Sequence, residues 1–209
     1  MNFGRKKYLL FLATFLSVSC GPALKTERVS LSKGDDLALT ITDKWVLTDT
    51  KNAVKEIMDK MSTHKGLQRY ISGFTAKGKL PKLFIMEVNN QTSEPYFPVD
   101  DFNDEFLQSI SESGDFTLID NKARANILKE LKYQNDGMVD PQQAKSIGKM
   151  SGADLLIFGD IRMKPETLKG RTIKEYTVNL RMTNLQSGEE VWRARYNTQK
   201  YSERKGSSW

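Results

Sequence analysis

Hydrophobic residues in the middle of the chain recur mainly at helical spacing. The first run predicts a helix that begins at Asp49 or Thr50 and ends near Met61, with its methionines in the core. A similar pattern continues to Ile71 and then breaks over residues 73–81, which contain Gly73, Gly78 and Pro81. The apolar positions of these two runs are Val54, Ile57, Met58, Met61, Leu67, Tyr70 and Ile71.

Three further helices follow from capping residues placed before apolar-periodic runs. One begins at Asp100 or Asp101 and ends at Gly114, and another begins at Asp120 or Asn121. The dipeptide Asp140-Pro141 predicts the start of a third, which Gly152 can close. Their apolar faces comprise Phe102, Phe106, Leu107 and Ile110, then Ala123, Ile127, Leu128 and Leu131, then Ala144, Ile147 and Gly148.

Other segments show the patterns of β-strands. Residues 83–88 and 155–158 are apolar almost throughout, which predicts strands covered on both faces, and 116–119 predicts another. Apolar and polar residues alternate from Tyr176 to Thr183, as in a half-exposed strand. Residues 184–188 predict a turn, after which Val191 to Tyr196 pairs back as a hairpin.

The order of these elements indicates the fold class. Helices interleave with the early strands, whereas the last strands follow each other directly. We therefore expect an α/β (α+β) domain, a mixed sheet of about five strands with helices packed on it, ending in an antiparallel hairpin.

The first twenty residues have the layout of a secretory signal. Arg5, Lys6 and Lys7 precede an apolar run of about eleven residues, too short for a helix that must cross ~30 Å of hydrocarbon. The stretch from Leu16 to Cys20 resembles the lipobox of bacterial lipoproteins, which implies lipidation at Cys20. The alternatives are an ordinary signal peptide with an incidental cysteine, or a buried free thiol.

These observations predict three parts of the chain: a signal peptide over 1–19, a lipidated tether over 20–44 and a globular domain over 45–209. The tether is polar and contains a single proline, Pro22. Fully extended it reaches at most ~90 Å, and as a relaxed coil about 25–30 Å.

Composition excludes several classes of function. Removal of the three signal-peptide cations takes the formal net charge from +6 to about +3, and no stretch is dense in Lys, Arg and aromatics, so nucleic-acid binding is not expected. His64 is the only histidine and Cys20 the only cysteine, which argues against Cys/His catalysis and His- or Cys-rich metal sites. Nucleotide-binding and serine-hydrolase motifs are also missing. We expect no enzyme activity, no metal and no cofactor.

Several short segments, in order and spacing, resemble the LpoB family of lipoproteins and, more distantly, the amino-terminal part of the curli secretion lipoprotein. They are Phe84 to Thr92, Ser113 to Ile119, Ala144 to Gly148, Gly152 to Asp154 and its following strand, and Leu185 to Trp192. The resemblance covers about Asp49 to Gln199.

The resemblance implies a function without chemistry of its own. Members of that family are outer-membrane lipoproteins that face the periplasm and activate a bifunctional penicillin-binding protein, a peptidoglycan synthase. It points to Asn90, Phe158 and Glu189 as partner contacts, where Phe158 stands in place of a tyrosine of the relatives. The tether departs from the enterobacterial pattern, which is long and rich in proline.

Two other functions remain open from the sequence. A subunit of a curli-type outer-membrane secretion assembly would share the sheet scaffold, and the segment Ile173 to Met182 has nearly the length and alternation of a membrane-spanning strand. A surface lipoprotein used for scaffolding or adhesion is the other.

Overall fold

The computed structural model describes residues 42–119 and 151–203. Its helices are α2 (Leu47–Thr63), α3 (Lys65–Thr75) and α4 (Val99–Ser113). Its strands are β1 (Lys82–Ile85), β2 (Asn89–Gln91), β3 (Thr117–Leu118), β4 (Leu155–Leu168), β5 (Arg171–Asn184) and β6 (Glu190–Glu203). The helices predicted to begin at Asp120 or Asn121 and at Asp140 lie outside the described residues.

The described strands form one mixed sheet in the order β3-β1-β4-β5-β6. Strands β3, β1 and β4 run parallel, whereas β4, β5 and β6 are antiparallel. The short strand β2 pairs with Asp160 to Arg162 of β4, beyond the stretch that β1 covers. The predicted mixed sheet with packed helices and a final antiparallel hairpin is therefore confirmed.

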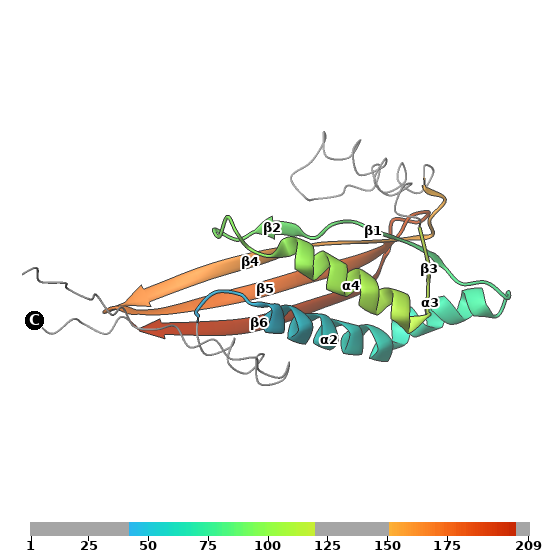
Figure 1. Cartoon of the computed structure of the whole chain (residues 1–209). Coiled ribbons are helices and arrows are strands. Elements are labelled where there is room, and N and C mark those ends of the chain that lie inside the picture. Colours follow the sequence, from blue (N-terminus) through green and yellow to red (C-terminus); the bar gives the residue numbers. More distant parts are fainter. Residues whose placement is uncertain (1–41, 120–150, 204–209) are drawn as a thin grey trace, which may run out of the picture.

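Helices α2, α3 and α4 lie against one face of this sheet (Figure 1). The predicted apolar side of α2 is buried through Val54, Ile57 and Met61, and that of α4 through Phe102, Phe106 and Ile110. They pack against the alternate residues of β5 that the sequence predicted to point inward. Those are Tyr176, Val178, Leu180 and Met182, all without exposed surface.

The helix boundaries differ from the predicted ones. Helix α2 begins at Leu47, where Asp49 is the third helical residue and its Oδ2 accepts from the N–H of Val46 at 2.9 Å. Helix α4 begins at Val99, so Asp100 and Asp101 occupy its first turn, where carboxylates favour the helix dipole without capping. Helix α3 continues through Gly73 to Thr75.

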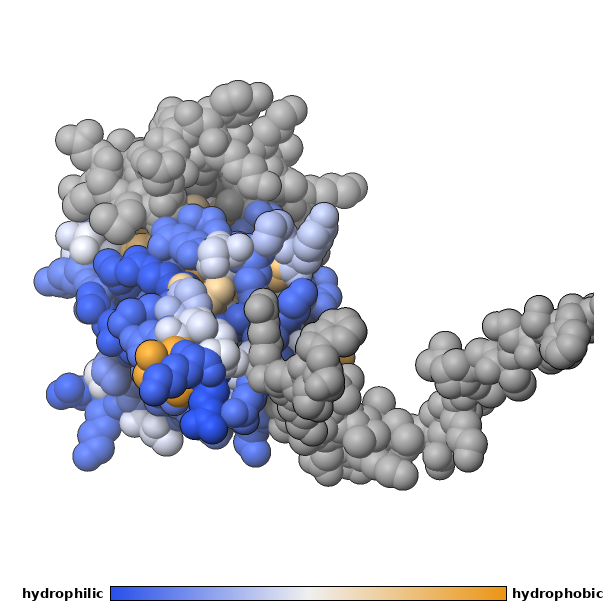
Figure 2. Space-filling view, turned by 90° about the vertical axis from the view of Figure 1, so that its left-hand side faces the viewer, coloured by the Kyte–Doolittle hydropathy of each residue, from blue (hydrophilic) through white to orange (hydrophobic). Residues whose placement is uncertain are grey.

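The last three strands each contain 14 residues, so the sheet extends well beyond the helices (Figure 1). Figure 2 looks at the end of the sheet where β4 and β5 join, and most of its surface there is hydrophilic. The exposed apolar residues of this hairpin are Leu168 and Ile173. Among the described residues, no helix is long and apolar enough to cross a membrane.

Candidate interaction surface

The three predicted contact residues lie in β4, in β2 beside it and in the turn that follows β5. Phe158 lies in β4 itself, and Asn90 pairs with Ile161, three residues further along. Glu189 lies at the other end, because its carbonyl accepts from the N–H of Asn184, the partner of Leu155. At ~3.3 Å per residue, the line from Leu155 to Ile161 is about 20 Å long.

The side chains of Phe158 and Asn90 lie on opposite faces of the sheet. Alternate residues of β4, such as Leu155, Ile157 and Ile161, belong to the core beneath the helices. Phe158 points to the opposite side of the strand. It packs at the edge of a second apolar cluster, formed by Phe84, Ala153, Leu156 and Leu185. We call this second side, which carries Phe158, Asn179 and Arg195 and points away from α2 and α4, the outer face.

Asn90 is the Cα partner of buried Ile161, and paired residues of neighbouring strands point to the same face of a sheet. The Asn90 side chain therefore lies on the helix-covered face. Its Oδ1 accepts from the N–H of Thr92 at 2.9 Å and from Thr92 Oγ1 at 2.7 Å, while its Nδ2 donates to the carbonyl of Glu94. Asn90 therefore shapes the loop that follows β2. Residues 89–91, which follow the predicted strand of residues 83–88, form the short strand β2.

Glu189 projects from a tight turn between β5 and β6. Asn184 Oδ1 accepts from the N–H groups of Gln186 and Ser187 at 2.8 and 3.1 Å, and Gly188 adopts φ 78°, a conformation that favours glycine. The Glu189 carboxylate is exposed and accepts from Ser187 Oγ at 3.0 Å. The turn thus holds an exposed carboxylate in a defined position.

The outer face also carries a polar hollow of about 370 Å³ across β4, β5 and β6. Four arginines line it, two of them on β6. Its residues are Asp160, Arg162, Asn179, Leu180, Arg181, Arg193, Ala194 and Arg195. The Cα partners Phe158, Arg181 and Arg193 form one row across the three strands, so the hollow borders the predicted contact at Phe158.

Hydrogen bonds order most of these side chains. Asp160 Oδ2 accepts from Arg162 Nη2 at 2.9 Å, and its Oδ1 accepts from Asn179 Nδ2 at 2.9 Å. Arg195 Nε donates to Asn179 Oδ1, also at 2.9 Å. These bonds connect Arg162, Asp160, Asn179 and Arg195 into one polar network across the three strands.

Little in the sequence indicated this hollow. No segment is dense in arginine, because Arg162, Arg181 and the pair on β6 come from three strands that only the sheet brings together. The available signal was the alternation itself, which puts Arg181 on the exposed side of one strand and Arg193 and Arg195 on that of the next.

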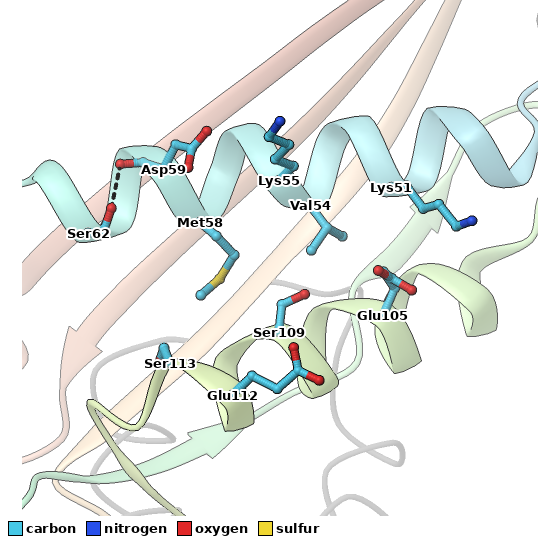
Figure 3. A pocket seen from close by; sticks show the side chains of 10 residues that line it. All are labelled: Lys51, Val54, Lys55, Met58, Asp59, Ser62, Glu105, Ser109, Glu112 and Ser113. Carbon is cyan, nitrogen blue, oxygen red and sulfur yellow. Dashed lines mark hydrogen bonds between the residues drawn. The ribbon is translucent and has the colours of Figure 1, made fainter. Parts of the chain in front are cut away.

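A second hollow, of about 450 Å³, lies between α2 and α4 (Figure 3). Val54 and Met58 point into it from α2, and Lys51 on α2 lies opposite Glu105 on α4. Its charged residues carry both signs, and its shape follows from the packing of two helices.

Among the described residues, no group of three His, Cys, Asp or Glu side chains is placed to hold a metal ion.

A third polar cluster holds the segment where the chain enters the domain. Lys174 Nζ lies 2.9 Å from Glu94 Oε1 and 3.3 Å from Asp43 Oδ2. Asp43 also accepts from Ser202 Oγ at 3.0 Å, and Tyr176 donates to Glu94 Oε2 at 3.0 Å. Burial and the neighbouring Glu94 raise the pKa of Tyr176, which keeps its hydroxyl protonated as a donor.

The same cluster shifts the pKa values of its charged members. Burial alone would raise the pKa of Asp43, but the Ser202 hydrogen bond and the charge of Lys174 hold it below 3.8. Burial alone would lower the pKa of Lys174, but Glu94 and Asp43 raise it above 10.5. The Asp43 carboxylate stabilises the fold at pH values above the ordinary pKa of an aspartate, and the Lys174 ammonium does so at pH values below the ordinary pKa of a lysine. The cluster therefore stabilises the fold between about pH 4 and 10.5, and its contribution weakens outside that window.

Replacing Asp43 by asparagine should therefore destabilise the domain at pH 7, by less than about 1 kcal/mol because water reaches part of the site. At pH 3 the unfolded wild-type chain binds a proton at Asp43 more readily than the folded chain does, so the difference between the two proteins should shrink. Urea unfolding at both pH values measures this. The exposed Asp104, changed to asparagine, is the control, and an equal wild-type advantage at pH 7 and pH 3 would contradict the assignment.

The chain contains one histidine and one cysteine. His64 is exposed, and its Nδ1 accepts from the N–H of Leu67 at 3.0 Å, which caps α3. The sequence did not reveal this capping role, although the break between two apolar runs at His64 was a signal for it. Cys20 lies outside the described residues.

Comparison with known proteins finds a family and similar folds. The sequence model of the family described as peptidoglycan-synthase activator LpoB matches residues 49–198. The LpoB C-terminal domain from Salmonella enterica is 17% identical, with a TM-score of 0.43, over 64% of this chain and 95% of that one. The corresponding Escherichia coli domain is 16% identical, with a TM-score of 0.43, over 63% and 93%.

A third solved structure is lipoprotein GNA1162 from Neisseria meningitidis. It is 12% identical, with a TM-score of 0.41, over 61% of this chain and 88% of that one. Comparison with curated proteins finds no match.

Proposed function

The chain belongs to the LpoB family of peptidoglycan-synthase activators, and from this we propose that its folded domain binds a bifunctional penicillin-binding protein and raises its rate of glycan polymerisation. The observation that carries the proposal is the family match over residues 49–198, which spans nearly all of the predicted globular domain. A family of activators is consistent with a regulatory role in which the chain performs no chemistry itself.

The proposed contact surface comprises Phe158 and Glu189, with Asn90 shaping the adjacent loop. Phe158 is partly buried at the edge of an apolar cluster, as expected of an aromatic anchor that completes its burial in a partner. Glu189 adds an exposed carboxylate in a rigid turn. Asn90 supports the surface from the other side of the sheet through its bonds to Thr92 and Glu94.

We also propose that Cys20 carries a lipid anchor in the outer membrane, with the domain facing the periplasm. The chain enters the domain beside Lys174 and Ser202, whereas Glu189 follows the far end of β5. Ten residues of strand separate Lys174 from Asn184, about 34 Å at ~3.4 Å per residue. This length adds to the short tether of residues 20–44 and moves the contact surface away from the anchor.

The test starts from the full chain in its own cell envelope. We expect it to fractionate with membranes, and to leave them when Cys20 is changed to alanine. Capture from detergent-solubilised membranes should recover a bifunctional penicillin-binding protein, and the purified chain should accelerate polymerisation by that synthase.

Substitution then tests the surface. Glu189→Gln and Phe158→Leu should each weaken binding about tenfold, as expected for interface anchors. Glu112→Gln, an exposed glutamate on α4, serves as the control. Capture without any penicillin-binding protein, combined with an unchanged polymerisation rate, would overturn the proposal; normal binding by both contact variants would overturn only the assigned surface.

A further inference from the structure

The arginines of the outer face are arranged at a cost to the folded domain. Arg181 and Arg193 are direct Cα partners on neighbouring antiparallel strands. Side chains at such positions lie about 5 Å apart at Cβ, and like charges directly opposite each other destabilise a sheet. Glu190 offsets part of this repulsion, but one carboxylate cannot neutralise both guanidinium groups, so positive charge remains at this row for a ligand to pair with.

Two carboxylates, Asp160 in the hollow and Glu190 beside it, pair with only half of its arginines. Arg193 donates two hydrogen bonds to Glu190, at 2.9 and 2.8 Å, and Arg162 is paired with Asp160. Arg195 donates to the neutral amide of Asn179. Arg181 makes no hydrogen bond or ion pair with any other residue that the structure describes, although its charge is close enough to act on Glu190.

We propose that this hollow receives an acidic segment of the synthase, whose carboxylates pair with Arg181 and Arg195. The inference rests on the proposed function and adds the chemistry of the partner to it. Guanidinium groups bind carboxylates through two parallel hydrogen bonds, and Arg181 and Arg195 have donors left for this geometry. Phe158, directly beside Arg181, supplies an apolar contact to the same segment.

A protein segment fits the surface better than a uniform polyanion. Asp160 and Glu190 stand among the arginines, so a polymer with a regular row of negative charges would meet repulsion at both positions. A peptide can place its carboxylates opposite Arg181 and Arg195 and put neutral or donor groups elsewhere. Aromatic or aliphatic side chains of a peptide can also cover Phe158. An anionic wall polymer offers less apolar surface for this contact.

The experiment measures binding of the full chain in detergent to its bifunctional penicillin-binding protein, at about 50 and 300 mM salt. Arg181→Gln and Arg195→Gln should each weaken binding about tenfold at low salt, and less at high salt where charges are screened. The control is Arg171→Gln, which removes an exposed arginine at the start of β5 that is paired with Glu203. Because Arg181 faces Arg193, Arg181→Gln should unfold no earlier than the wild type, so lost binding cannot be lost folding.

Each contrary result points to a different error. If the wild type binds the synthase and both arginine variants bind equally well, the acidic segment is excluded and the proposed function stands. If the wild type binds no synthase, the proposed function and this inference fall together. If Arg181 is needed instead for sedimentation with purified cell-wall sacculi, the ligand is an anionic wall polymer and the inference is wrong.

Discussion

Replacing Lys200 with methionine should destabilise the domain by about 3 kcal/mol, because it leaves a buried carboxylate without its cation. Lys200 lies on the helix-covered side of β6, and its Nζ is 2.7 Å from Asp49 Oδ2. The two residues are only 7% and 3% exposed. Among the described residues the Lys200 ammonium has no other partner, and the pair joins β6 to the first turn of α2.

The double variant Asp49→Asn with Lys200→Met identifies the cause. An asparagine at position 49 can still accept from the N–H of Val46, as the aspartate does now, and no buried charge remains. Its stability should return to within about 1 kcal/mol of the wild type, because replacing both members of a buried pair is often neutral. The single variant should lower the melting temperature by roughly 6–12 °C, at 2–4 °C per kcal/mol.

The control for Lys200 is an exposed lysine in an ion pair. Lys164 lies 2.8 Å from Glu166 with 75% of its side chain exposed, so Lys164→Met should leave the denaturation midpoint unchanged. Urea unfolding of the four proteins provides the comparison. A Lys200→Met variant as stable as the wild type would show that the pair contributes nothing to folding.

The sequence predicted where elements lie better than where they end. The apolar run of residues 155–158 predicted a strand that ends at Phe158. In the structure it continues to Leu168. Pro165 is tolerated because β2 ends its pairing with β4 at Arg162, which leaves that edge of β4 without a neighbouring strand in the described residues.

The candidate site was less predictable for a related reason. Asn90, Phe158 and Glu189 came from a resemblance, and nothing local in the sequence indicates which face of the sheet each side chain takes. Strand β2 has only three residues, too few for a periodic signal, yet its parallel pairing puts Asn90 beneath the helices and Gln91 on the outer face. Long-range register, not local pattern, assembles the arginine hollow.

Gly159 should be the least replaceable glycine of the described sheet. A Cβ at this position would overlap the carbonyl oxygen of Asn179 and lie 2.6 Å from Leu180 Cδ2. The first conflict is with backbone, so no change of rotamer can relieve it, and β4 and β5 would have to separate locally. Gly159 is therefore required by the close approach of two strands at the centre of the sheet.

Gly159→Ala should consequently cost about 3 kcal/mol, at the upper end of the usual range for overpacking. It should also weaken synthase binding, since Phe158 and Asp160 flank the displaced residue and both face outward. The matched control is Gly73→Ala in α3, where an added Cβ meets nothing within 4 Å. A glycine inside a helix is less favourable than alanine by roughly 0.5–1 kcal/mol, so the control should be stabilised. Thermal unfolding distinguishes the two positions, and a Gly159→Ala protein that melts with the wild type would mean that β4 and β5 are not in such close contact there.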